Sequence, residues 1–176
     1  GETLFAKCLQ RYFVDEPAGK AVRNREGYLR KKIKECILSN KDKDKIKILA
    51  VASGPAMEIQ RLILEKDFNG RQIEFHLLDQ DLDALKHAQR KILEIARIHK
   101  KEVKIVLHNT TIKNIVQSGL PDSEFNLIYS AGLFDYFTDP VAIYAARQLY
   151  DGLADEGLLI IGNFSSNNPN QFAMGL

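Results

Sequence analysis

Residues 45–63 read KIKILAVASGPAMEIQRLI, a sequence that passes from a strand through a tight turn into a helix. KIKILAV is a short aliphatic run typical of a buried strand, and MEIQRLI has apolar residues at helical spacing. Between them lie the small residues ASGPA at 52–56, where Gly54 can adopt backbone angles that other residues avoid. Such a turn lets a ligand approach the free N–H groups at the start of the helix. A tight turn with nothing bound explains this stretch equally well.

Strand and helix patterns alternate through the rest of the chain. Further apolar runs lie at 72–79, 102–109, 125–130 and 157–164, and helical patterns lie at 57–66, 82–99, 112–117 and 140–153. This alternation predicts an α/β fold with a doubly wound, mainly parallel, Rossmann-like sheet covered by helices on both faces. We expect Asp81 to cap the helix at 82, and Asp139 to cap the helix that Pro140 begins.

The residues before the sheet predict a separate helical section. Helical patterns at 4–13 and 25–38 flank a predicted loop at 14–24 that contains Pro17. The domain prediction is therefore a helical section at 1–44 and an α/β core at 45–176. Arg23, Asn24 or Arg25 could reach a ligand carboxylate from the helical section, although packing and a solvated charge run are slightly favoured.

Composition narrows the class of protein and its partners. The 176 residues suit one domain, and a net charge of +2 is too small to indicate a nucleic-acid partner. No apolar run reaches the ~20 residues of a membrane helix, and no signal peptide is recognisable. Cys8 and Cys36 are isolated, so we expect a reducing cytoplasm and neither a disulfide nor a bound metal. The oligomeric state is left open.

The residues just after each strand are the candidates for a site, because doubly wound sheets bind ligands beyond the carboxyl ends of their strands. Asp79 ends the second strand, where an acid typically accepts hydrogen bonds from both ribose hydroxyls, although it could instead cap a helix. Asn109 and Thr110 end the third strand, and a short amide or hydroxyl side chain there could read an adenine edge. His108 is expected to be structural.

The fourth strand ends in the sequence SAGLFDYFTD at 130–139. Its first three residues are small, and Asp135 and Tyr136 lie where a substrate would meet a cofactor. A solvent-facing loop anchored by Phe134 and Phe137 is the alternative. The G-x-G-x-x-G pattern and the P-loop are both absent, which argues against a dinucleotide or a nucleoside triphosphate. A nucleoside without phosphates fits better, and S-adenosylmethionine is such a ligand.

At this point the sequence resembles class I S-adenosylmethionine-dependent methyltransferases. ILAVASGPAMEI is similar to their first motif, with Ala50 at the position of an acid and Ala52, Gly54 and Ala56 at the positions of three glycines. HLLDQD resembles the second motif, which implies that Asp79 binds the cofactor ribose, and HNTT resembles the adenine-contacting region. The resemblance implies the strand order 3-2-1-4-5.

The likeness continues over about residues 45–165. FNLIYSAGLFDYF resembles the fourth motif, with Asn126 where an acid is common, and LADEGLLIIGNF resembles a turn at Glu156-Gly157 followed by the fifth strand. Two departures are the altered first motif and the absence of the two C-terminal strands that the family adds, so a truncated sheet is expected. SGPAMEI, LLDQDLDAL, YSAGLFDYF and NFSSNNP are also similar to bacterial proteins of 3-hydroxypalmitic acid methyl ester biosynthesis.

The resemblance implies a methyltransferase that uses S-adenosylmethionine and acts on a small molecule, possibly the carboxylate of a fatty-acid-like substrate. A carboxylate needs no general base, and Asp135 or His108 would be the candidate base for a hydroxyl or amine acceptor. A non-catalytic cofactor-binding module is the alternative, and the Gly54-Pro55 turn argues against an NAD-dependent oxidoreductase. The candidate cofactor-binding residues are Ala52, Ser53, Gly54, Pro55, Ala56, Glu58, Asp79, Gln80, Asn109, Thr110, Ser130, Ala131 and Gly132; Asp135 and Tyr136 are the candidate substrate-binding residues.

Overall fold

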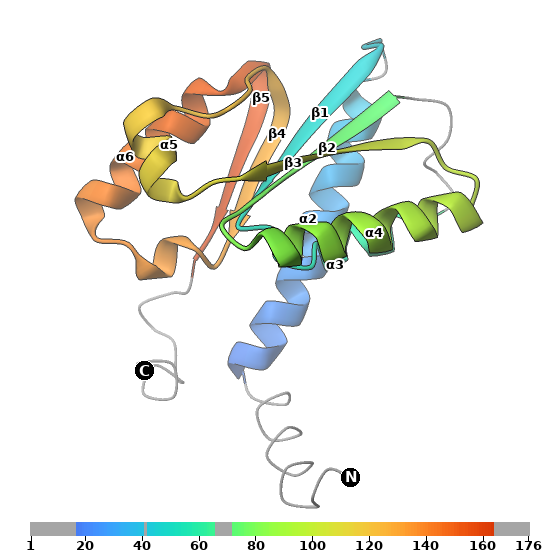
Figure 1. Ribbon diagram of the computed structural model, residues 1–176, viewed down its shortest axis with the longest axis horizontal. Helices are drawn as coiled ribbons and strands as arrows, with labels where there is room; N and C mark the ends of the chain where they lie inside the picture. The colour runs from blue at the N-terminus through green and yellow to red at the C-terminus, as the bar shows by residue number, and fades with distance from the viewer. Residues whose placement is uncertain (1–16, 41, 66–71, 164–176) are drawn as a thin grey trace, which may run out of the picture.

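The computed structural model describes residues 17–40, 42–65 and 72–163, and Figure 1 shows their helices arranged around one sheet. The predicted helix at 4–13, with Cys8, lies outside the described residues. The described elements follow one another along the chain as α2 (Pro17–Ser39), β1 (Lys45–Val51), α3 (Met57–Ile63), β2 (Gln72–Asp79), α4 (Leu82–Ile98), β3 (Val103–Asn109), α5 (Ile112–Ser118), β4 (Phe125–Ala131), the 3-10 helix η1 (Phe134–Tyr136), α6 (Asp139–Asp151) and β5 (Leu153–Gly162).

The five strands form one parallel sheet in the predicted order, β3-β2-β1-β4-β5. Strand order reverses between the β1–β2–β3 half and the β4–β5 half, so β1 and β4 are neighbours at the switch point. The register pairs Val51 with Ser130 and Asp79 with Asn109. The carboxyl ends of these strands therefore share one edge of the sheet, and the small-residue turn after β1 lies at that edge.

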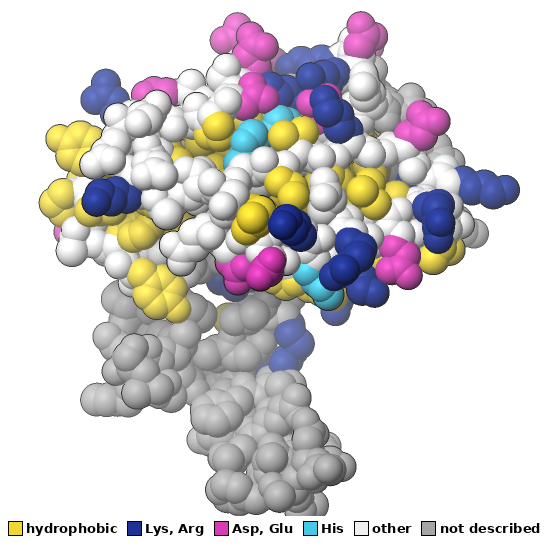
Figure 2. Space-filling model, viewed as in Figure 1, with side chains coloured by type: hydrophobic (Ala, Val, Ile, Leu, Met, Phe, Trp, Pro, Cys, Tyr) yellow, Lys and Arg dark blue, Asp and Glu magenta, His cyan; other side chains and the backbone are white. Residues whose placement is uncertain are grey.

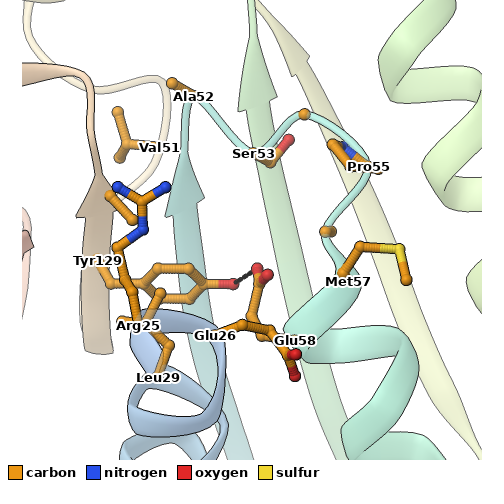
Figure 3. Close-up of a pocket in the computed structure, with 13 residues that line it drawn as sticks. Arg25, Glu26, Leu29, Val51, Ala52, Ser53, Pro55, Met57, Glu58 and Tyr129 are labelled. Atoms are coloured by element: carbon orange, nitrogen blue, oxygen red, sulfur yellow. Dashed lines mark hydrogen bonds between the residues drawn. The ribbon is translucent and has the colours of Figure 1, made fainter. Parts of the chain in front are cut away.

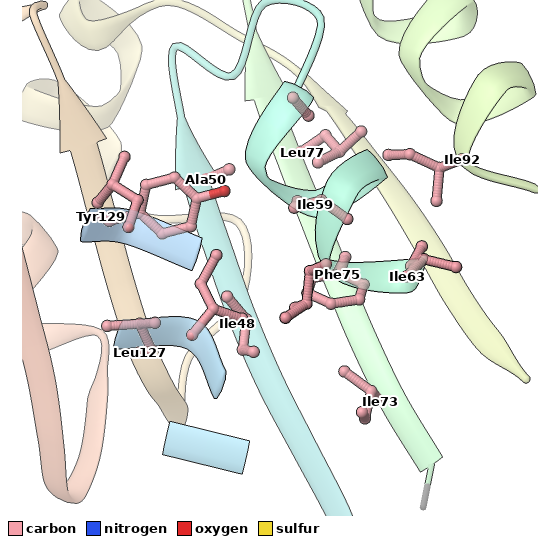
Figure 4. Close-up of a cluster of buried hydrophobic side chains, with 14 of the residues drawn as sticks. Ile48, Ala50, Ile59, Ile63, Ile73, Phe75, Leu77, Ile92, Leu127 and Tyr129 are labelled. Atoms are coloured by element: carbon pink, nitrogen blue, oxygen red, sulfur yellow. The ribbon is translucent and has the colours of Figure 1, made fainter. Parts of the chain in front are cut away.

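Two hydrophobic clusters hold helices on the two faces of the sheet. On one face, Ile48 and Phe75 of the sheet pack in one cluster with buried residues of α2, α3 and α4 (Figure 4). On the other face, Leu49 and Phe125 pack with α5 and with Leu149 of α6. Burying each large apolar side chain contributes about 1.5–3 kcal/mol, so these two layers fix the position of the strand ends.

The loop predicted at 14–24 is wrong from residue 17 onward, because α2 begins at Pro17. Proline fits the first turn of a helix, where its missing N–H would have no intrahelical acceptor. Leu29, Ile33 and Ile37 of the same helix are buried in the cluster on the sheet. Helix α2 therefore extends back to Pro17, and the packing of its C-terminal half on the sheet stabilises it.

The fifth strand begins at Leu153 instead of residue 157 and ends at Gly162. Its pairing with β4 shifts between Phe125 and Leu127, and Glu156 has a φ of 62°. The sequence predicted a turn at Glu156-Gly157 that precedes the fifth strand. In the structure these two residues lie within the strand, at an irregularity in its pairing. Between the pairs formed by Phe125 and Leu127, β5 has three more residues than β4, and such an insertion interrupts the apolar pattern in the same way as a turn.

The helix starts were predicted with mixed success. Asp81 caps α4 as predicted, since its Oδ1 accepts hydrogen bonds from the backbone N–H groups of Asp83 (2.9 Å) and Ala84 (3.0 Å). The prediction for α6 is wrong by one residue, because Thr138 occupies the N-cap position and makes no side-chain capping bond. Among the described residues, no helix combines the length and apolar character needed to cross a bilayer.

Candidate active site

The turn between β1 and α3 has an unusual backbone conformation. Ala52, Gly54 and Ala56 all have positive φ angles, of 53°, 49° and 50°. This left-handed conformation is easy for glycine and costs about 1–2 kcal/mol for a residue with a Cβ. The alanines therefore retain a geometry suited to glycine, and backbone strain of this kind is concentrated at functional sites.

Hydrogen bonds from the second strand hold this turn in place. The backbone N–H of Ser53 donates to the carbonyl of Leu78 (3.1 Å), and that of Gly54 donates to Oδ2 of Asp79 (3.0 Å). The other carboxylate oxygen of Asp79 accepts from the N–H of Asp81 (3.0 Å). Asp79 thus connects the ends of the first and second strands and lies beside the turn.

The end of β3 supports the same edge. The side-chain amide of Asn109 donates to the carbonyls of Asp79 (3.2 Å) and Gln80 (3.0 Å). The N–H of Thr110 also donates to the carbonyl of Asp79 (3.2 Å). In this structure Asn109 therefore holds the backbone around the acid through its amide nitrogen.

A pocket of about 280 Å³ opens on the other side of the turn (Figure 3). Helix α2, the end of β1, the start of α3 and the end of β4 all contribute to it. Its lining residues are Arg25, Glu26, Leu29, Val51, Ala52, Ser53, Gly54, Pro55, Ala56, Met57, Glu58, Tyr129 and Ala131.

A half-buried acid and a buried phenol lie together in this pocket. The hydroxyl of Tyr129 donates to Oε1 of Glu58 over 2.6 Å, the short distance of a charge-assisted bond. Burial raises the pKa of Glu58 above its usual range, and the bond from Tyr129 partly offsets that effect. Tyr129 pairs across the sheet with Ala50, the position at which the resemblance expected an acid. The carboxylate at this place therefore comes from α3 instead of β1.

Arg25 lies across the pocket from this acid (Figure 3). A Cβ added to Gly132 would meet Nη1 of Arg25 at 2.6 Å, and one added to Gly162 would meet its Cδ at 3.5 Å. Gly132 also has a φ of 84° and donates its N–H to the carbonyl of Gly162 (2.9 Å). Gly132, just after β4, therefore makes room for the arginine of α2, and Gly162 at the end of β5 lies at ordinary contact distance from it.

The arrangement can recognise both charges of an amino-acid zwitterion. Glu58 offers a carboxylate to an ammonium group, and Arg25 offers a guanidinium to a carboxylate. Glu26, which also lines the pocket, forms ion pairs with Arg30 and Arg61. The Oγ atoms of Ser53 and Ser130 are buried and have no hydrogen-bond partner among the residues that the structure describes.

Comparisons with known proteins were made at the levels of sequence and structure. No protein-family model matches the chain, and no curated protein matches its sequence. The structure is similar to a complex of DhpI with SAM and HEP, with a TM-score of 0.52 and 12% identity over 100% of this chain and 73% of that chain. The chain has the fold of a methyltransferase.

Two further solved methyltransferases have this fold. For the carbon methyltransferase of CurJ, the TM-score is 0.62, with 14% identity over 85% of this chain and 38% of that chain. For the plantazolicin methyltransferase BpumL, in complex with a pentazolic desmethylPZN analog and SAH, the TM-score is 0.55, with 18% identity over 97% of this chain and 56% of that chain. These identities establish the fold alone, and the chain spans only part of each of these proteins.

The predicted site residues fall into two groups according to whether they line the pocket. Those that line the pocket are Ala52, Ser53, Gly54, Pro55, Ala56, Glu58 and Ala131. Those that lie at adjacent strand ends outside it are Asp79, Gln80, Asn109, Thr110, Ser130 and Gly132. Asp135 and Tyr136 belong to the exposed 3-10 helix after β4.

Several pocket residues had no clear signal in the sequence. Tyr129 lies within an apolar strand and reads as a core residue, and Leu29 reads as part of an apolar helix face. Arg25 was one of three candidates in a charged run, and the structure brings it, not Arg23 or Asn24, to the pocket. The spacing of a helical pattern shows which residues share a face but not what that face covers.

His108 contacts a second histidine, on the sheet face that carries α5 and α6. Its Nε2 lies 2.8 Å from Nδ1 of His76, and the two rings are stacked. Around the pair, Oε2 of Glu74 lies 3.5 Å from Nε2 of His76, and Oδ2 of Asp122 lies 3.8 Å from its Nδ1, while Lys47 donates to Oδ1 of Asp122 (2.8 Å). Burial and the neighbouring His108 lower the pKa of His76 to about 4.

This histidine will make the protein less stable in mild acid. Unfolded histidine binds a proton near pH 6.5, whereas folded His76 binds one only near pH 4, so the unfolded state holds more protons between these values. We expect the free energy of unfolding to fall by roughly 1–3 kcal/mol between pH 7 and pH 4 because of this residue. Urea unfolding at a series of pH values measures it.

The control separates His76 from other groups that titrate over this range. His76→Gln should flatten the dependence of unfolding free energy on pH, whatever it does to stability at pH 7. The same substitution at His99, which is exposed at the end of α4, should leave the dependence as it is in the wild type. An equally steep dependence in His76→Gln and wild type would contradict the assignment.

Proposed function

We propose that the chain is a methyltransferase that uses S-adenosylmethionine. The observation that carries the proposal is the β1–α3 turn, which has three residues with positive φ, one of which, Gly54, donates its N–H to the carboxylate of Asp79, beside a pocket of mixed charge. A backbone held open in this way accepts the bulk of a nucleoside, and a strand-end acid suits its ribose diol. The fold and the cofactors named in the DhpI and BpumL complexes support the same cofactor here.

The chain offers a partner to each part of this cofactor. We assign the ribose to Asp79 and the adenine to Gln80, Asn109 and Thr110 at the ends of β2 and β3. The amino-acid tail is assigned to Glu58 for its ammonium and Arg25 for its carboxylate. The remaining candidates form the floor and wall of the site, namely Ala52, Ser53, Gly54, Pro55, Ala56, Ser130, Ala131 and Gly132.

When bound, S-adenosylmethionine supplies a methyl group on a sulfonium sulfur, which a nucleophile of the acceptor displaces to leave S-adenosylhomocysteine. The residues of the chain position the reactants and exclude water, with helix α2 as a wall of the pocket. Residues 1–44 are proposed as the lid section to which α2 belongs. No side chain is assigned as a catalytic base, and His108 contacts His76 on the face opposite the cluster formed with α2, α3 and α4.

The acceptor proposed is a small molecule with a carboxylate, of the fatty-acid-like class that the narrower sequence resemblance implies. A carboxylate is ionised at neutral pH and attacks the methyl group without a base, so such an acceptor needs no catalytic base from the protein. Asp135 and Tyr136 follow β4 at the sheet edge that holds the turn, and they are the proposed acceptor contacts. A cofactor-binding module without catalysis is the second candidate, favoured by Ala50, Ala52 and Ala56 in the first motif.

Calorimetric titration with four ligands tests the proposal. S-adenosylmethionine and S-adenosylhomocysteine should bind, 5′-methylthioadenosine should bind more weakly because it lacks the amino-acid tail, and NAD should not bind. Absence of binding by all three adenosyl ligands, or preferential binding of NAD, would refute the proposed cofactor. Binding without methyl transfer to a panel of carboxylic acids would favour the non-catalytic module.

A further inference from the structure

Helix α6 exposes large apolar side chains on the side that faces away from the sheet. Its inner side buries Ala145 and Leu149, yet Ile143, Tyr144 and Tyr150 are 66%, 59% and 67% exposed. A surface helix that packs on one face normally carries polar residues on the other, and apolar residues on both sides indicate a covered helix. The outer surface of α6 that carries these three residues is called the α6 face below.

Helix α4 carries mainly charged residues on its outer side. It exposes Lys86, Arg90, Lys91, Glu94 and Arg97 toward solvent, and its exposed apolar residues, Leu82, Leu93 and Ile98, are spread over the length of the helix. In Figure 2, hydrophobic side chains gather along the side of the molecule where Figure 1 places α6, while charged side chains dominate around α4. Exposed apolar groups that gather on one helix mark an interaction surface more often than scattered ones.

The order of residues along α6 shows what kind of partner fits. Asp139, Ile143 and Arg147 follow one another at intervals of four, and all three are exposed. Rows with this interval form the ridges along which two packed helices most often cross. With Ile143 as the centre, an acid lies four residues before it and a base four residues after it, and Tyr150 lies about two helical turns after it.

This symmetry is what an antiparallel pair of identical helices requires. In a twofold dimer, each residue before the centre of one helix faces the residue equally far after the centre of the other. Arg147 would face Asp139 of the second copy, twice over, with the two Ile143 side chains at the axis. The charges are then complementary and the apolar residues are covered.

We propose that the α6 face binds a second copy of this chain, with two α6 helices crossing antiparallel at Ile143. The α6 face provides the apolar centre of the interface, and the Asp139–Arg147 pairs at its rim fix the register. This dimer is independent of the cofactor and of the proposed methyl transfer.

Sedimentation velocity on the full chain over a range of concentrations tests the dimer. The wild type should sediment as a monomer–dimer equilibrium, and Ile143→Asp should weaken the dimer by roughly tenfold or more, because it buries two charges at the axis. Ile98→Asp is the matched control, since Ile98 is 65% exposed on α4 and Ile143 is 66% exposed. A wild type that stays monomeric at all concentrations, or equal effects of the two substitutions, would overturn the proposal.

A charge exchange tests the register. Arg147→Glu should weaken the dimer by roughly tenfold, since it places like charges opposite each other, and Asp139→Arg combined with Arg147→Glu should restore it. Circular dichroism of each variant checks that α6 still folds. Failure of the double variant to recover would overturn the antiparallel register. Flotation with phosphatidylserine vesicles that depends on Ile143, in a chain that remains monomeric, would assign the α6 face to a membrane surface instead.

Discussion

Replacing Asp79 with alanine will lower the affinity for S-adenosylhomocysteine about 100-fold, since two charge-assisted hydrogen bonds to the ribose, each about 1.5 kcal/mol, are lost. The same carboxylate holds the N–H of Gly54 at 3.0 Å, so the turn also loses an acceptor. Binding of 5′-methylthioadenosine should fall by a similar factor, because that ligand keeps the ribose. Calorimetry with both ligands measures the effect.

Asp81→Ala provides the control for a loss of local structure. Asp81 caps α4 two residues after Asp79, and its removal should cost about 1 kcal/mol of stability with little change in affinity. Asp79→Asn, which keeps an oxygen acceptor for Gly54, should bind better than Asp79→Ala and worse than the wild type. An affinity unchanged by Asp79→Ala would remove this carboxylate from the site.

Replacing Glu58 with glutamine will lower the affinity for S-adenosylhomocysteine about 30-fold, because a charge-assisted contact with the ligand ammonium of about 2 kcal/mol becomes a neutral one. Glutamine has nearly the same shape and keeps an oxygen for the hydroxyl of Tyr129, which lies 2.6 Å from Glu58. The affinity for 5′-methylthioadenosine should stay the same, because that ligand has no ammonium. This selectivity distinguishes Glu58 from Asp79.

The pH dependence of binding gives a second measurement on the same residue. Burial raises the pKa of Glu58, and only its ionised form attracts an ammonium group. Affinity for S-adenosylhomocysteine should therefore fall as the pH drops through this pKa in the wild type, and should vary less in Glu58→Gln. If Glu58→Gln lowers the affinity for S-adenosylhomocysteine and for 5′-methylthioadenosine equally, the acid supports the pocket structurally and does not bind the ammonium of the amino-acid tail.

The boundaries of β1 and β2 could be predicted from sequence to the residue, because each is an apolar run bounded by polar or small residues. The position of Asp79 beside the β1–α3 turn followed from the same pattern, since parallel strands bring their carboxyl ends to one edge. The start of α2 and the bulge in β5 could not be predicted, because Pro17 and the residues around Glu156 interrupt an apolar pattern in a folded element as they would in a loop.

The sequence by itself determined the order of strands and helices, the small-residue turn and the acid at the end of β2, all of which depend on residues close together in the chain. Only the tertiary structure decided that Ala52 and Ala56 adopt a glycine-like conformation and that Tyr129 of β4 hydrogen-bonds Glu58 of α3. It also brought Arg25 of α2 over Gly132. These contacts join residues far apart in sequence, and they depend on strand register and helix packing, which the two hydrophobic clusters set together and no local pattern encodes.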